Sequence, residues 1–290
     1  MIRVPDSREK LLLLANPGML VEDATGNAGM ELGLNGKVAL VTGANRGIGA
    51  AIAMELAREG VHVCLVARDL TKLNEVAAAL RDTANVRAAV HAADLREPSA
   101  AADAVKVATG TFGRLDILVN NAGATKRADF FTLSDEDFLD GFALKFHGYV
   151  RMTRAAWPHL RSARGNIVNI VGVGAHSGSA EFTIGGSVNV AILNFTKAMA
   201  DIGLKDGVRV NAINPGLIET ERFGRTTERT MRDRSCSRDE AIAYLLSSWG
   251  TTRVGRPDEI GAMTAFLASH RADYLQGSII DVDGGATRSL

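Results

Sequence analysis

From Gly36 onward, short apolar runs alternate along the chain with longer segments whose apolar residues recur at helical spacing. The runs that we expect to form strands are Val38–Thr42, Val61–Ala67, Val86–Ala92, Leu115–Asn120, Asn166–Gly172, Val208–Ile213 and Ser278–Val282. The expected helices lie near residues 47–59, 70–82, 98–110, 134–162, 187–204 and 257–269. Apolar runs without alternation are typical of strands that helices cover on both faces. The pattern predicts the α/β class: a Rossmann-type, doubly wound, seven-stranded parallel sheet with helices on both faces.

The first 33 residues do not share this alternation. Breaker residues interrupt them at Asn16–Gly18 and again at Thr25–Gly29. We therefore expect a flexible N-terminal extension over residues 1–33 and a single domain over residues 34–290. Met30 leads directly into the domain, so the extension is open to two interpretations: a translation-start artefact, or an arm that reaches a neighbouring subunit.

Composition and charge narrow the class of partner. The chain has 290 residues, 46% of them hydrophobic, which is enough for one large core. Its 33 basic residues balance its 33 acidic ones, which argues against nucleic acid or an anionic membrane as a partner. No apolar run approaches the ~20 residues of a membrane-spanning helix. Two cysteines and six dispersed histidines predict neither a disulfide scaffold nor a metal site. We expect a cytoplasmic protein that acts on a small-molecule substrate.

A glycine-rich turn follows the first strand of the domain and opens a helix, in the stretch Thr42–Gly49. Gly43 allows the chain to turn off the strand, Gly47 allows the backbone to approach a pyrophosphate, and Gly49 allows close helix–sheet packing. The helix N-terminus then presents free N–H groups to phosphate. Because the glycines lie between a strand and a helix, the turn predicts a dinucleotide site.

Further motifs follow in the order of the strands. These are Asp94-Leu95, Asn120-Asn121-Ala122-Gly123, Pro215-Gly216 with Thr220, and Asp283-Gly284-Gly285. With Thr-Gly-x-x-x-Gly-Ile-Gly at the first turn, the chain resembles the short-chain dehydrogenase/reductase family over about residues 34–286. The resemblance implies that Asp94 holds the adenine and that residues 121–123 wall the adenosine ribose. It also implies that residues 215–220 contact the nicotinamide end and that the protein is a homodimer or homotetramer. An insertion near 218–250 corresponds to the family's substrate lid, with ordinary packing against the domain as the alternative.

The end of the second strand indicates which dinucleotide binds. A carboxylate there would hydrogen-bond the ribose of NAD, but the strand ends in Arg68, and Arg46 lies in the glycine turn. Two guanidinium groups favour the 2′-phosphate of NADP(H), although both are also acceptable as solvated surface residues. The expected cofactor-binding residues are Gly43, Asn45, Arg46, Gly47, Ile48, Gly49, Arg68, Asp94, Leu95, Asn121, Ala122, Gly123, Pro215, Gly216, Ile218 and Thr220.

The family's catalytic tetrad is not present at the matching positions. Lys145 replaces the asparagine, Gly172 the serine, Gly185 the tyrosine and Asn189 the lysine. The tyrosine is the family's usual proton donor. None of the three tyrosines of this chain falls between residues 150 and 243, so no shift of alignment places one at that position. The loss of bulk at the two glycines is expected to enlarge the pocket.

Two of these replacements amount to an exchange: the asparagine and the lysine of the tetrad have changed places, as Lys145 and Asn189. In the family fold the positions of Lys145 and Asn189 face one another across a water, so an ammonium is expected to remain near its usual place. We expect Lys145 to stabilise oxyanion character or supply a proton, with Asn189 beside it. The alternative is a lysine whose stem packs while its head reaches water. His176 is a third candidate, as a general acid, although a solvent-facing loop histidine is the commoner case.

Three functions are consistent with these residues. The first is an NADP(H)-dependent oxidoreductase that acts on a carbonyl or alcohol with non-standard proton handling. The second is an NADP(H)-binding protein without redox turnover, and the third is a lyase or isomerase that uses Lys145.

Six arginines and five acidic residues in the stretch 221–240 indicate a solvated helical face, with attraction of an acidic substrate as the alternative.

Overall fold

The computed structural model describes residues 20–22 and 28–288 and divides the chain into two units, residues 1–33 and 34–290. In the first unit, β1 (Leu20–Glu22) pairs antiparallel with β2 (Ala28–Met30). The predicted flexibility of the extension concerns residues that lie mostly outside the described ones. Among the described helices, none has both the length and the apolar character needed to cross a membrane.

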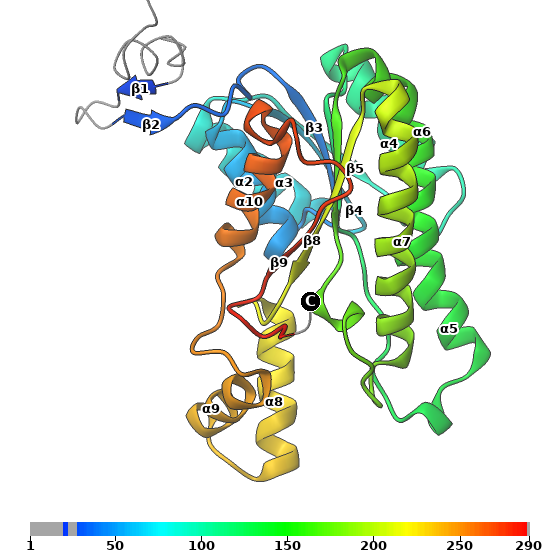
Figure 1. Cartoon of the computed structure of the whole chain (residues 1–290), viewed down its shortest axis with the longest axis vertical. Coiled ribbons are helices and arrows are strands. Elements are labelled where there is room, and N and C mark those ends of the chain that lie inside the picture. Colours follow the sequence, from blue (N-terminus) through cyan, green and yellow to red (C-terminus); the bar gives the residue numbers. More distant parts are fainter. Residues whose placement is uncertain (1–19, 23–27, 289–290) are drawn as a thin grey trace, which may run out of the picture. The chain divides into compact units, whose positions relative to one another are not determined.

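The second unit is built on a seven-stranded sheet in the order β5-β4-β3-β6-β7-β8-β9, and every neighbouring pair is parallel (Figure 1). Its strands are β3 (Val38–Thr42), β4 (His62–Ala67), β5 (Ala88–Ala92), β6 (Ile117–Asn120), β7 (Asn166–Ile170), β8 (Arg209–Pro215) and β9 (Ile279–Val282). The order reverses between β3 and β6, as in doubly wound folds. The predicted Rossmann-type, seven-stranded fold is confirmed, with no strand end shifted by more than two residues.

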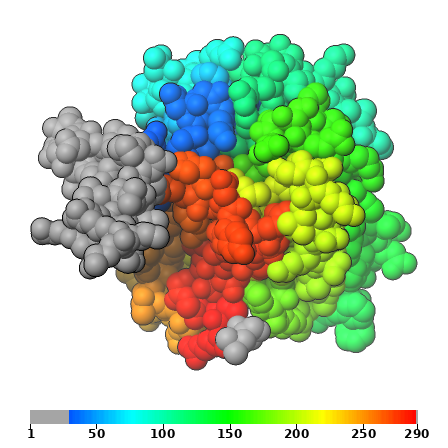
Figure 2. All heavy atoms as spheres, turned by 45° about the horizontal axis from the view of Figure 1, so that its top comes forward, coloured from blue at the N-terminus to red at the C-terminus, as the bar shows by residue number. Residues whose placement is uncertain are grey.

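Helices cover both faces of this sheet (Figure 1). One layer holds α2 (Gly47–Arg58), α3 (Leu70–Ala84) and α10 (Pro257–Ala268), and the other holds α4 (Ala100–Phe112), α6 (Gly148–Ala163) and α7 (Thr183–Asp206). In Figure 2, the segments near residue 50 (blue) and residue 270 (orange) lie side by side, consistent with contacts between α2 and α10. Because both faces are covered, all residues of β3, β6 and β7 are buried.

The helix expected over residues 134–162 is divided in the structure. It begins as α5 (Asp135–Gly141), where Ser134 and Asp137 form a reciprocal capping box. It continues as a π-helical turn, η2 (Phe142–His147), before α6. π-Helical turns are rare in proteins, and those that occur often lie at functional sites. Lys145 lies within η2, so the irregular turn decides the direction of its side chain.

Two helices form the segment expected to be a lid. They are α8 (Glu221–Arg234), capped by the hydroxyl of Thr220, and α9 (Arg238–Trp249), which starts with a capping box between Ser237 and Glu240. Figure 1 shows both helices beyond the carboxyl end of β8. This is the edge of a doubly wound sheet where ligands bind.

Candidate active site

The glycine turn after β3 forms a cradle of open backbone. Gly43 and Gly47 have φ of +65° and +54°, a region that favours glycine. A Cβ on Gly49 would lie 2.2 Å from the carbonyl oxygen of Gly43, whereas a Cβ on Gly47 would meet nothing closer than Thr220 Cγ2 at 3.4 Å. The close position packs the helix on the turn, and the open one leaves room for a ligand.

The first turn of α2 offers donors to that ligand. No side chain caps the helix at Arg46, and its first turn contains no acidic residue. Unsatisfied N–H groups at such an end bind phosphate, so these residues fit a dinucleotide pyrophosphate.

Asn121 and Ala122 close the floor of the cradle. Their N–H groups donate to Thr42 Oγ1 at 2.9 and 3.0 Å, and Asn121 Nδ2 donates to the carbonyl oxygens of Thr42 and Gly43 at 2.9 and 3.2 Å. The Asn121 side chain thus ties the turn after β6 to the turn after β3. Its contacts in the structure are with protein backbone, and the role of walling a ribose stays a prediction for this residue.

The two arginines expected to bind a 2′-phosphate are both accessible and both paired. Arg46 Nη1 lies 2.5 Å from Glu221 Oε2, and Arg68 Nη1 lies 3.8 Å from Asp94 Oδ2. Lys72 on α3 brings a third cation, its Nζ 3.9 Å from Glu221 Oε1. The sequence interpretation missed Lys72 and Glu221, although Glu221 directly follows the Thr220 of a predicted motif. The three cations suit a phosphate, and Glu221 shares two of them.

The two residues of the Asp94-Leu95 motif, which follows β5, make different contacts. Asp94 accepts the N–H of Arg96 at 3.0 Å, and its Oδ1 lies 3.3 Å from the same residue's guanidinium. Leu95 is 4% exposed and belongs to the main core cluster. Leu95 is therefore a packing residue in this structure, whereas the carboxylate of Asp94 lies beside Arg68. The role of Asp94 in holding the adenine stays a prediction.

The motif after β8 shapes the opposite end of the cradle. A Cβ on Gly216 would lie 2.7 Å from Asp283 Cα, so the closing segment of the domain requires glycine there. Ile218 is buried and forms a parallel bridge with Gly255. Pro215 ends β8 beside Val282 of β9. These residues place Thr220 3.4 Å from the Cβ position of Gly47, which brings the two ends of the predicted cofactor site together.

Lys145 points into the turns that follow β6 and β7. Its ammonium donates to Asn189 Oδ1 and to the carbonyl oxygen of Val171, both at 2.7 Å. A Cβ on Gly123 would lie 2.9 Å from Lys145 Cδ, so the glycine of the third motif makes room for the lysine stem. Burial, reinforced by the positive charge of Arg222, lowers the pKa of Lys145 from 10.5 to about 7.

Asn189 is buried on α7 and completes this arrangement. Its Nδ2 donates to the carbonyl oxygen of Gly172 at 3.3 Å, while its Oδ1 accepts from Lys145. The exchanged pair is thus in direct hydrogen-bonded contact. A solvated lysine head, the alternative interpretation, does not describe an ammonium held by two acceptors within the protein.

Phe182 fills the position of the missing tyrosine. A Cβ on Gly185 would lie 2.1 Å from the Phe182 ring, and one on Gly174 would lie 2.9 Å from it. The expected enlargement of the pocket at Gly185 is therefore wrong, because an aromatic ring three residues earlier occupies the space. The signal was present in the sequence as a large apolar residue at helical spacing from the glycine.

His176 is held on the side of β9. Its Nε2 lies 2.9 Å from Asp281 Oδ1, which also accepts from Asn214 Nδ2 at 2.9 Å. Asn214 Oδ1 in turn accepts the N–H of Gly172 at 3.2 Å. The structure thus brings Lys145 and Asn189 together but ties His176 to a different strand, and its catalytic role stays a prediction.

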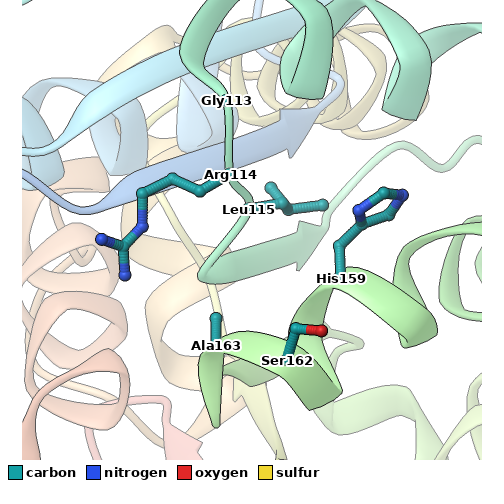
Figure 3. Close-up of a pocket in the computed structure, with 6 residues that line it drawn as sticks. All are labelled: Gly113, Arg114, Leu115, His159, Ser162 and Ala163. Carbon is teal, nitrogen blue, oxygen red and sulfur yellow. The ribbon is translucent and has the colours of Figure 1, made fainter.

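A separate pocket of about 490 Å³ lies at the opposite edge of the sheet (Figure 3). Its lining residues are Gly113, Arg114, Leu115, His159, Ser162 and Ala163. Residues 113–115 precede β6, whereas the motifs follow its carboxyl end, and Arg114 turns away from His159 to bind Asp116. This pocket brings no motif residue together. Within the described residues, no group of three or more histidine, cysteine or acidic side chains could hold a metal ion.

Comparisons with known proteins agree with this geometry. A family model described as enoyl-(acyl carrier protein) reductase matches residues 43–287. The short-chain reductase protein NovJ of Streptomyces niveus is 37% identical over 249 residues, covering 86% of this chain and 93% of NovJ. The structure of L-sorbose reductase from Gluconobacter frateurii, complexed with NADPH and L-sorbose, has a TM-score of 0.84 and 35% identity, covering 90% of this chain and 100% of that one.

A second solved structure is also similar to this chain. It is the apo structure of a short-chain oxidoreductase from Pseudomonas aeruginosa PAO1, described as containing an atypical catalytic center. It has a TM-score of 0.81 and 31% identity, and the match covers 88% of this chain and 98% of that one.

Proposed function

The chain belongs to the short-chain dehydrogenase/reductase family, and from that premise we propose that it is an NADP(H)-dependent oxidoreductase whose proton-handling residue is Lys145. The substrate is a carbonyl compound, or the corresponding alcohol in the reverse direction. The observation that carries this proposal is the 2.7 Å hydrogen bond between Lys145 Nζ and Asn189 Oδ1. It keeps an ammonium between the two positions that the family uses, after their side chains have been exchanged.

The choice of NADP(H) rests on charge. Arg46, Arg68 and Lys72 lie around the end of β4 and the glycine turn, where the resemblance expects the adenosine ribose. The solved relative from Gluconobacter frateurii binds NADPH. Bound NADPH would supply a hydride to the carbonyl carbon of the substrate.

The chain's own contribution is to provide the proton and hold the carbonyl oxygen. An ammonium has three N–H donors, and Lys145 directs two of them to Asn189 and to Val171. The third is left for the substrate oxygen, which takes that proton as the carbonyl becomes a hydroxyl. The resulting neutral amine keeps its two donors satisfied. It directs a lone pair at the same place, ready to accept a proton in the oxidative direction.

The pKa of Lys145 suits this task. A general acid or base works best when its pKa lies near the operating pH, and burial lowers the pKa of this ammonium to about 7. Asn189 acts as a positioning residue, because its amide joins Lys145 to the carbonyl oxygen of Gly172. The departure from the family's tetrad has a parallel in the similar oxidoreductase from Pseudomonas aeruginosa PAO1, which is described as containing an atypical catalytic center.

Replacing Lys145 with methionine tests the proposal. Lys145→Met should lower carbonyl-dependent NADPH oxidation by about 10²–10⁴-fold, the usual contribution of a positioned acid–base group. Binding of NADPH, followed by calorimetry, should stay close to that of the wild type. Lys205→Met, at an exposed position on α7, is the matched control. Unchanged turnover in Lys145→Met would exclude the proposed role.

The lowered pKa also favours a second candidate. A neutral amine near pH 7 is the form that attacks a carbonyl to give a Schiff base, as in lyases that use lysine. Borohydride treatment with candidate carbonyl compounds, followed by peptide mapping, would label Lys145 in that case. Labelling without NADPH oxidation would favour the lyase. Binding of NADPH with neither result would favour a protein without redox turnover.

A further inference from the structure

Three arginines lie beside the candidate site and add to the positive charge of Lys145. Arg127 follows the turn after β6, and Arg222 and Arg229 lie on α8. Burial lowers the pKa of Arg127, and the charges of Arg229 and Arg222 lower it further. Arg222 and Arg229 therefore both lie close enough to Arg127 to repel its charge. Such a group of like charges is costly unless an anion joins it.

The position of Arg127 relates this group to the reaction. Its guanidinium lies 4.5 Å from the centre of the Phe182 ring. That ring occupies the space beside Gly185, where the family carries its tyrosine. Phe182 thus serves as a platform that holds a cation above the place from which a phenol would otherwise reach the substrate.

The acidic side chains nearby do not balance these charges. Glu181 is the carboxylate that raises the pKa of Arg127, but a hydrogen bond from Arg229 already holds it. Arg222 donates from Nη2 to the carbonyl oxygen of Gly123 at 2.9 Å, and this acceptor carries no charge. Asp233 also pairs with Arg229, at 3.5 Å. Of these charges, three are positive and two are negative, and the ammonium of Lys145 adds to the positive excess.

We propose that the substrate carries an anionic group, a carboxylate or a phosphate, which Arg127 binds with help from Arg222 while the carbonyl faces Lys145. A guanidinium presents parallel N–H donors that match both oxyanions. This inference rests on the proposed function, because it names the substrate class of the same site. Apolar and sugar ketones of similar size would lack the group that these arginines recognise.

Matched pairs of substrates test the inference. Short-chain oxo acids are compared with their methyl esters, which have the same carbonyl but no charge, by the consumption of NADPH. Wild type should prefer the acid by at least about tenfold in kcat/KM, or 1.4 kcal/mol. Arg127→Met should remove this preference by raising KM for the acid while leaving the ester unchanged. Phosphorylated ketones form a second arm, and the larger preference identifies the anion.

Lys126→Met is the control for that variant. Lys126 is the adjacent cation, but its ammonium is bound to Asp137 at 2.8 Å. It should keep the wild-type preference for the acid. Equal use of acid and ester by wild type, or an equal loss of both in Arg127→Met, would overturn the inference.

A binding measurement separates this inference from the proposed function. The protein saturated with NADP⁺ is titrated with malonate and, separately, with inorganic phosphate. Arg127→Met should weaken binding of one of them by about tenfold or more, and Lys126→Met should not. If no carbonyl compound is reduced, the proposed function fails while this titration still reports on the anion site. No binding by wild type, or equal affinity in Arg127→Met, would overturn the inference.

Discussion

The turn after β3 and the pocket after β7 lie on the same edge of one sheet, yet they depart from the family to different degrees. The first keeps every expected glycine, and a single Cβ on Gly49 would collide with the backbone of Gly43. The second has exchanged all four expected side chains, and Lys145, Asn189 and Phe182 fill the space again. A site made of backbone has few alternative solutions, whereas one made of side chains can be rebuilt from the opposite wall.

The largest effect on cofactor binding should come from adding one methyl group to the glycine turn after β3. Gly49→Ala places a Cβ 2.2 Å from the carbonyl oxygen of Gly43, so the turn must shift. Overpacking of this kind costs about 1–3 kcal/mol, and we expect NADPH affinity to fall by well over tenfold. Calorimetry measures the affinity and chemical denaturation the stability. Gly110→Ala, where a Cβ meets nothing within 4 Å, is the control. Normal affinity in Gly49→Ala would show that the turn is as adaptable as the pocket.

The pH dependence of turnover tests the role of Lys145 in the pocket after β7. With the pKa of Lys145 at about 7, the proton-donating ammonium is lost as pH rises through 7. Reduction should therefore slow above neutrality, while oxidation of the alcohol should speed up. In Arg222→Met the repelling charge is gone, so the pKa of Lys145 rises and the falling limb of the profile moves to higher pH.

Arg232→Met is the control for this shift, since it removes the same charge from an exposed position on α8. A profile that is unchanged in Arg222→Met, or a reduction rate independent of pH, would contradict the assignment of Lys145.

A smaller effect, a gain in NADPH affinity, should follow when Arg46 and Lys72 are freed from Glu221. Glu221 pairs with Arg46 at 2.5 Å and approaches Lys72 at 3.9 Å, so a 2′-phosphate must compete with it. Glu221→Gln should tighten NADPH binding severalfold, within the ~1 kcal/mol of an exposed ion pair, and leave NADH binding unchanged. Glu228→Gln, exposed on the same helix, serves as the control. Equal gains for both dinucleotides would place the competing anion at the pyrophosphate instead.

The smallest effect is expected at the third catalytic candidate. His176→Gln retains a donor for Asp281. The contacts of His176 are with Asp281 on β9 and Asn214 on β8, and not with Lys145 or Asn189. Turnover should therefore change by less than the roughly 10²-fold expected for a positioned acid, and by no more than about threefold. A loss comparable to that of Lys145→Met would make His176 the proton donor.

The cofactor half could be predicted from the sequence because its determinants are local. The glycines of residues 43–49 lie within two turns of chain, and their spacing alone indicates how strand, loop and helix meet. At Leu95, the motif position does not reveal that the side chain enters the core.

The sequence by itself determined the fold class, the glycine cradle and the absence of a phenol between residues 150 and 243, because each depends on residue type and short spacing. Only the tertiary structure decided that Lys145 meets Asn189 across 44 residues and that Arg46 meets Glu221 across 175. It also decided that Phe182 occupies the space beside Gly185. Side-chain direction at such contacts depends on a π-helical turn and on packing between distant helices, which local spacing does not encode.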